Sequence, residues 1–102
     1  MKILITKATS SEAHRLKSKL NADDVLLGDY VELPDFMLKS GTMIRLPKPE
    51  SDIYTHEMLA LCLDNNITTL YALGNEEYNV LIIAVQLFNE YGIEILNNTN
   101  EL

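Results

Sequence analysis

Five short aliphatic runs alternate with segments of helical periodicity, and this alternation constrains the fold more than any other feature of the chain. The runs are residues 2–6, 24–29, 42–46, 68–73 and 93–96. Short apolar runs of this kind are typical of strands buried in a parallel sheet. Parallel neighbours need a crossover connection, and crossovers are right-handed, so helices cover both faces of the sheet. We therefore predict an α/β fold with a parallel sheet of about five strands in the order 3-2-1-4-5.

Three helices are predicted between the strands. The first begins at the capping box of residues 9–12, and the second follows a cap at Ser51 or Asp52. The third runs as one helix over residues 75–91, capped by its first residue, with acidic side chains in its first turn. Residues 30–41 have no regular period, and we expect a loop with one helical turn there.

The length of 102 residues predicts a single domain. We assign residues 1–97 to it and residues 98–102 to a polar C-terminal tail. The longest apolar run, residues 80–85, is too short to cross a bilayer, so no membrane partner is expected. A single cysteine, Cys62, and the lack of a signal peptide favour a cytoplasmic location.

The charge of the chain is strongly acidic and unevenly spread. The net charge of -7 makes nucleic acid an unfavourable partner. Residues 1–20 nevertheless hold five basic side chains and only one acid, while residues 21–102 hold three basic and fourteen acidic side chains. Arg15, Lys17 and Lys19 concentrate the positive charge on the first helix. They are candidates for an interface with another copy of the chain or with a partner protein, although a solvated helix surface also accounts for them.

Any ligand site is expected where the strand order reverses, at the carboxyl ends of the first and fourth strands. Two loops meet there, residues 7–11 and residues 74–77. Free amides at the start of the first helix would attract an anion, and Lys7 adds a positive charge. The candidate cleft residues are Lys7, Thr9, Ser10, Asp29, Asn75, Glu76 and Glu77.

A dinucleotide site needs glycines in the first of these loops, because a side chain keeps the pyrophosphate away from the backbone amides. Residues 7–11 contain no glycine, and the P-loop pattern is absent from the chain, so no cofactor is expected. Asp29 has the position of a ribose-binding acid, but a turn residue at a strand end explains it as well.

The other reactive side chains do not form a catalytic set. His14 and His56 are expected to be exposed, and Cys62 is expected to be an inert core thiol. Glu76 and Glu77 would suit a metal or an acid-base step, but favourable placement at a helix amino terminus also explains them. We therefore predict no catalytic residue and no metal ligand, and no catalysis by this chain alone.

A resemblance to a known family spans residues 2–96. It rests on the segments KILIT (2–6), LGD (27–29), LPKP (46–49), EMLALC (57–62), and NEE (75–77) through LFNEYGI (87–93). These segments resemble the amino-terminal, pre-ATP-grasp domain of ATP-grasp ligases, and most of all the carbamoyl-phosphate synthase large-subunit-like group. The resemblance implies a small three-layer Rossmann-like domain. In that family a following module holds ATP and magnesium, and the front domain shapes the acceptor-substrate side of the cleft.

Two functions are compatible with this resemblance. The first is a stand-alone, non-catalytic domain that acts by association with itself or with a partner protein. The second is a split subunit that completes an ATP-dependent carboxylate-amine ligase whose ATP-grasp half is a separate chain. In the second case Lys7, Ser10, Glu76 and Glu77 would line the shared cleft. An independent small-ligand site is less favoured, because a sheet of this size leaves a shallow crevice.

Overall fold

A computed structural model describes residues 2–20, 24–31, 33, 35–39, 41 and 43–97. The predicted polar tail, residues 98–102, lies outside the described residues. The strands are β1 (Ile3–Ile5), β2 (Val25–Asp29), β3 (Met43–Arg45), β4 (Thr69–Tyr71) and β5 (Glu94–Leu96). The helices are α1 (Ser11–Leu20), α2 (Asp35–Lys39), α3 (Tyr54–Asp64), α4 (Asn75–Ile83) and α5 (Val85–Glu90).

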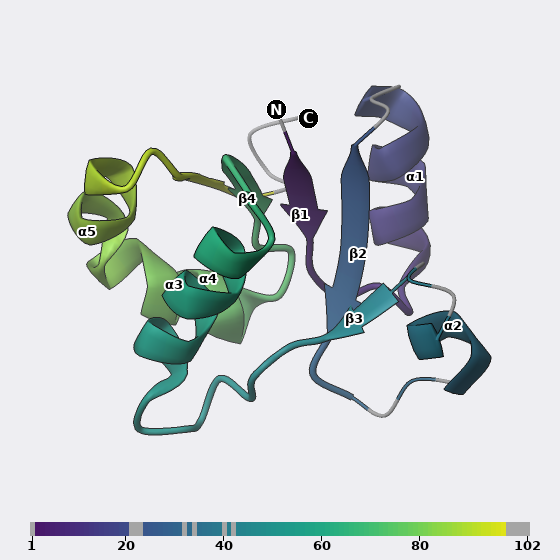
Figure 1. Ribbon diagram of the computed structural model, residues 1–102, viewed down its shortest axis with the longest axis horizontal. Coiled ribbons are helices and arrows are strands. Elements are labelled where there is room, and N and C mark those ends of the chain that lie inside the picture. The colour runs from purple at the N-terminus through teal and green to yellow at the C-terminus, as the bar shows by residue number, and fades with distance from the viewer. Residues whose placement is uncertain are drawn as a thin grey trace.

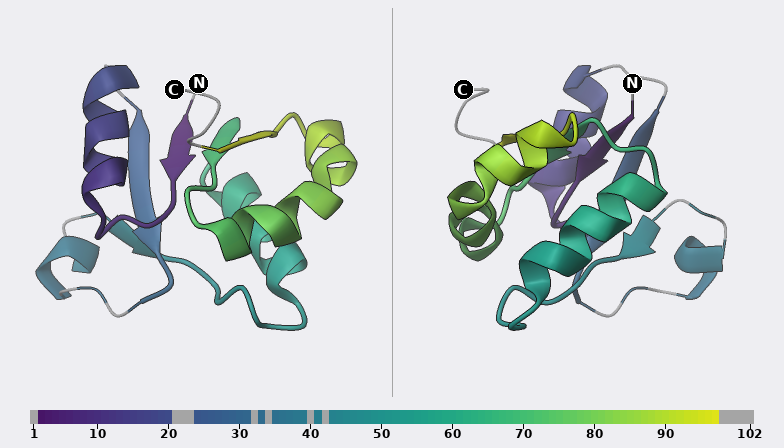
Figure 2. Two further views of the ribbon diagram at one scale, coloured as in Figure 1. Left: turned by 180° about the vertical axis from the view of Figure 1, so that it is seen from behind. Right: turned by 60° about the vertical axis from the view of Figure 1, so that its left-hand side comes forward.

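The five strands form one parallel sheet in the order β3-β2-β1-β4-β5, which confirms the predicted topology. β1 lies at the centre, where Leu4 is in register with Leu26 of β2 and Leu70 of β4. Helices α1 and α2 cover one face of the sheet and α3, α4 and α5 cover the other (Figures 1 and 2). The chain therefore has the three layers expected of a doubly wound α/β domain.

Alternation along each strand divides the core into two clusters, one on each face. Ile3 and Ile5 pack with Leu16 beneath α1. Leu4, between them in sequence, packs with Met58 of α3 and Phe88 of α5 on the opposite face. In the part of the chain that the structure describes, no helix has both the length and the apolarity that a bilayer span requires.

The predicted helix over residues 75–91 is wrong in one respect, because it is broken at Ala84. This residue leaves helical geometry, with φ -104° and ψ 21°, and its amide bonds to the carbonyl of Leu81, three residues back. β-branched side chains crowd this stretch and lose rotamer freedom in a helix, which lowers the cost of a break here. Gly92, at φ 78°, follows the end of α5 in the left-handed conformation that glycine adopts readily.

The predicted caps also need correction. Ser10, not Thr9, caps α1, because the Ser10 hydroxyl oxygen accepts a bond of 3.2 Å from the amide of Ala13. The capping position of α3 is Ile53, whose side chain cannot accept a hydrogen bond, so neither Ser51 nor Asp52 is the cap. The Ser51 hydroxyl instead accepts a bond of 3.3 Å from the Ile53 amide, just before the helix begins. For α4 the cap is Gly74, in extended geometry, so that Asn75 is already helical. Glycine is tolerated at a capping position because the backbone carbonyl of the cap, not its side chain, accepts the first helical hydrogen bond; here the Tyr78 amide donates to the Gly74 carbonyl at 2.9 Å.

Candidate functional site

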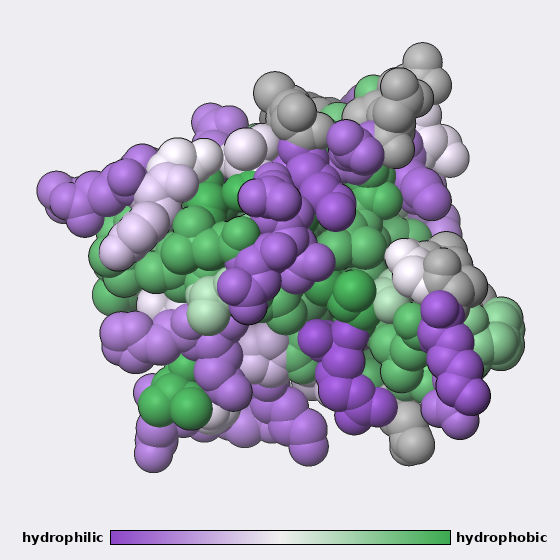
Figure 3. Space-filling model, in the orientation of Figure 1, coloured by the Kyte–Doolittle hydropathy of each residue, from purple (hydrophilic) through white to green (hydrophobic). Residues whose placement is uncertain are grey.

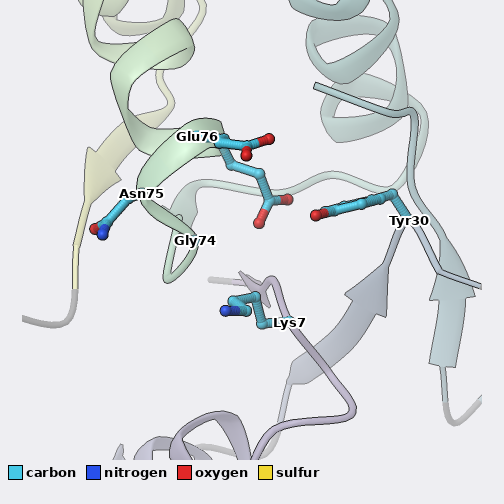
Figure 4. A pocket seen from close by; sticks show the side chains of 6 residues that line it. Lys7, Tyr30, Gly74, Asn75 and Glu76 are labelled. Carbon is cyan, nitrogen blue, oxygen red and sulfur yellow. The ribbon is translucent and has the colours of Figure 1, made fainter. Parts of the chain in front are cut away.

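A pocket of about 220 Å³ lies at the carboxyl ends of β1, β2 and β4, the place predicted from the strand order. Its lining residues are Lys7, Tyr30, Gly74, Asn75, Glu76 and Glu77 (Figure 4). Four of them were predicted from the sequence as candidate cleft residues: Lys7, Asn75, Glu76 and Glu77. The structure adds Tyr30 and Gly74, and it leaves Thr9, Ser10 and Asp29 out of the lining.

Lys7 reaches the pocket through an unusual backbone turn directly after β1. Its φ of 54° lies in the left-handed region, which costs an L-residue about 1–2 kcal/mol. Two bonds hold the turn: the amide of Ala8 donates to the carbonyl of Gly28 at 3.0 Å, and the Ser10 hydroxyl donates to the carbonyl of Lys7 at 2.7 Å. The Lys7 side chain then runs beneath Gly74, where a β-carbon at position 74 would lie 3.4 Å from Lys7 Cδ.

Glu77 is the residue that the structure sets apart from its neighbour Glu76. Glu76 is exposed, whereas only 1% of the Glu77 surface is accessible. Glu77 is the third residue of α4, from which an acid can reach back toward the amide of the capping residue. A β-carbon at Gly74 would lie 2.5 Å from Glu77 Oε1, so any other residue there would displace the Glu77 carboxyl.

Within the described ranges, the Glu77 carboxyl is buried without a hydrogen-bond partner on either oxygen. Burial raises its pKa from 4.5 to about 7, and the Asp29 charge adds to the rise. The Thr6 hydroxyl, Lys7 and the Gly74 backbone lie close enough to lower the pKa in part, although none of them makes a bond of normal geometry to it. The group therefore exchanges its proton near neutral pH.

Two tyrosines near Glu77 were not predicted as site residues. The Tyr30 hydroxyl points into the pocket (Figure 4), and burial together with four carboxylates raises its pKa. Those carboxylates are Glu76, Glu77, Asp29 and Glu50. Tyr54, on α3, is 1% exposed, and no described residue is a hydrogen-bond partner of its hydroxyl; burial and then the Glu77 charge raise its pKa. No local sequence signal marks either tyrosine as a site residue. The burial of Glu77 does have a signal, because Glu77 lies four positions before the buried Leu81 and therefore on the same, inner face of α4.

Asp29 and Thr9 form a contact of their own beside the pocket. The Thr9 hydroxyl donates to Asp29 Oδ2 at 3.0 Å, and the Thr9 amide approaches the same oxygen at 3.4 Å. The amide of Tyr30 donates to Asp29 Oδ1 at 2.8 Å. Both oxygens of this buried carboxylate are thus used within the chain, so Asp29 acts as a turn residue that holds the loop after β1 against the end of β2.

The remaining candidate residues lie away from the pocket. His14 and His56 are exposed, and Arg15, Lys17 and Lys19 lie on the exposed side of α1. Cys62 is buried in α3, and burial raises the pKa of its thiol to about 12. Across the described ranges, no three His, Cys, Asp or Glu side chains come together as metal ligands do.

No protein-family model and no curated protein matches this sequence. Among solved structures, the chain is similar to L-threonine 3-dehydrogenase from Trypanosoma brucei, with a TM-score of 0.62 and 20% sequence identity over 94% of this chain. The chain has a Rossmann-like fold. It spans 35% of the length of that dehydrogenase, and at this identity the similarity establishes the fold alone.

The Rossmann-like fold places the pocket where such sheets bind ligands. In this chain, however, side chains of the protein itself contact the two loops around the pocket. The first loop carries side chains instead of glycines and is bonded to Asp29. The second loop has the Glu77 carboxyl folded against Gly74 at the amino end of α4. Carboxylates of the chain itself therefore lie at or beside both loops, next to the amides that an anionic ligand would need. The pocket can instead accept hydrogen-bond donors.

Proposed function

We propose that this chain is a stand-alone, non-catalytic, pre-ATP-grasp-like domain that acts by association with another copy of itself or with a partner protein. The observation that carries the proposal is a run of apolar side chains along α4, the break at Ala84 and α5, which we call the apolar stripe: Val80, Ile83, Ala84 and Leu87. Ile83 is 86% exposed, whereas the other three are partly buried and pack against the core. Hydrophobic surface gathers over α5 and the adjoining helices in Figure 3. Exposed apolar surface of this kind marks contact sites.

The charges around the stripe support a basic partner surface. Residues 49–102 contain no lysine or arginine but nine acidic side chains, so the layer of α3, α4 and α5 is acidic. On the other face of the sheet, α1 exposes Arg15, Lys17 and Lys19. A second copy can therefore bring its basic α1 to the acidic layer, as can a basic helix of another protein. Such complementarity speeds association and selects the partner.

Ile83→Asp is expected to weaken association about tenfold or more, since it places a charge in the centre of the apolar contact. The measurement is the molar mass by light scattering across a concentration series. Gln86→Asp, which adds the same charge at an exposed position three residues away, is the matched control and should associate as the native chain does. Replacing Arg15, Lys17 and Lys19 with Gln should weaken self-association. The same replacement should not change how strongly Ile83→Asp weakens binding to a separate basic partner. A native chain that stays monomeric at every concentration and binds no basic helix would contradict the proposal.

The split subunit of a carboxylate-amine ligase is the second candidate. It is favoured by one observation, the gathering of Lys7, Glu76 and Glu77 around a pocket at the carboxyl edge of the sheet. Ser10 caps α1 and does not line that pocket, so it drops out of the shared cleft. If this candidate is right, ATP hydrolysis appears only when an ATP-grasp chain is added, and it falls about a hundredfold when Glu76 and Glu77 become Ala. Unchanged turnover in that variant would dismiss the candidate.

A further inference from the structure

We propose that the pocket between β1 and β4 binds the protonated primary amine of an organic cation, with the Glu77 carboxylate as its acceptor. The site is separate from the apolar stripe on α4 and α5, so this inference does not depend on the proposed association.

The first argument is the set of buried acceptors that lack a donor. Both Glu77 oxygens and the Tyr54 hydroxyl are closed to water and have no hydrogen-bond partner in the described part of the chain. Buried polar groups are nearly always paired, and an unpaired one carries its full desolvation cost. Glu77 lines the pocket, so a donor that enters there can reach the carboxyl once its side chain turns toward the opening.

The second argument is the sign of the charge. The Tyr30 hydroxyl, on the wall of the pocket, is acted on by Glu76, Glu77, Asp29 and Glu50. Lys7 is the cationic side chain in the lining. Asp29 already uses both of its oxygens within the chain, which leaves Glu77 as the buried acid with unused acceptors among the described residues. An anion entering here meets several carboxylates and a single ammonium group, so a cation is favoured.

The third argument concerns the kind of cation. A divalent metal needs several converging ligands, and within the described ranges no group of three acidic, His or Cys side chains provides them. A primary ammonium carries three N–H donors, and the two Glu77 oxygens are unused acceptors for them. A quaternary ammonium carries none. The volume of about 220 Å³ suits the end of a short aliphatic amine.

The test is a titration of the whole chain followed by amide chemical shifts, with three probes at matched ionic strength. Propylammonium should give saturable shifts at Gly74, Asn75, Glu76 and Glu77. Tetramethylammonium, which has the charge without the donors, should bind at least about tenfold more weakly, and propionate should not bind. Shifts with propionate that equal those with propylammonium, or shifts that never saturate, would overturn the proposal.

Two variants identify the acceptor. Glu77→Gln keeps the shape of the side chain and removes its charge, and it should weaken propylammonium binding at least about tenfold. Glu90→Gln, which removes the charge of an exposed acid that does not line the pocket, is the matched control and should change the affinity less than about twofold. Equal binding by the native chain and Glu77→Gln would refute the assignment, and the amide spectrum of each variant reports directly that it is folded.

The dependence on pH gives an independent readout, because the amine needs the ionised form of Glu77. With a pKa of about 7 for Glu77, affinity should rise about tenfold from pH 6 to pH 8 and then level off. The charges that face this group are those of Asp29 and Lys7, and Tyr54, whose pKa burial raises, stays neutral over that range. A flat profile would count against Glu77. Blocked lysine amide separates the two sources of this chemistry: tighter binding than propylammonium indicates the lysine of a partner protein, and weaker binding indicates a free small amine.

Discussion

Replacing Glu77 with Gln is expected to raise the free energy of unfolding at pH 8 by about 3 kcal/mol. In the native chain, a carboxyl whose pKa is raised from 4.5 to about 7 has to ionise inside the fold, with no hydrogen bond to either oxygen. The amide of Gln has the same shape and no charge, so it avoids most of this cost. The measurement is urea unfolding of the native chain and of Glu77→Gln, with Glu76→Gln as the exposed control.

The sign of the pH dependence follows from proton binding. Between about pH 4.5 and 7 the folded chain keeps a proton on Glu77 that the unfolded chain has released, so native stability falls as the pH rises. Below pH 4.5 Glu77 is protonated in both the folded and the unfolded chain, so Glu77→Gln should raise the free energy of unfolding only slightly. Above pH 7 the substitution should raise it by the full amount. Stability profiles of native and variant chains that run parallel from pH 4 to pH 8 would show that Glu77 ionises as an exposed acid does.

Phe88→Ala is expected to lower the free energy of unfolding by about 3–5 kcal/mol. Phe88 is fully buried between α5 and the sheet, where it packs with Leu81, Ile93 and Ile95, and its removal leaves a cavity. A domain of this size has about 5–15 kcal/mol in total, so a large part of its stability is lost.

Ile83→Ala, on the same helical layer but 86% exposed, is the control for this prediction and should change the stability of the monomer by less than about 0.5 kcal/mol. Both variants are measured by guanidinium unfolding at low protein concentration, so that association does not contribute. A loss below about 1 kcal/mol for Phe88→Ala would mean that α5 is not part of the folded core.

Local rules were sufficient to predict the sheet and the position of its pocket. Alternating apolar runs and helical periods define the elements, and right-handed crossovers restrict how parallel strands can be ordered. The strand order then brings the loop at Lys7 beside the loop at Asn75 and Glu76, which the pocket confirms as neighbours. The same local rules placed the caps of α1 and α3 one or two residues early and the cap of α4 one residue late, because several polar residues near each start can turn the chain.

The sequence by itself therefore determined the topology of this protein and which two loops form its pocket, since both follow from periods and connections along the chain. Only the tertiary structure separated Glu77 from Glu76, brought Tyr30 and Tyr54 to the same carboxyl, and joined Thr9 to Asp29, twenty residues away. The reason is that burial and pairing depend on what each side chain meets across the fold. Glu76 and Glu77 are adjacent and chemically identical, but successive residues of a helix point in different directions. The first side chain therefore lies in solvent and the second in the core.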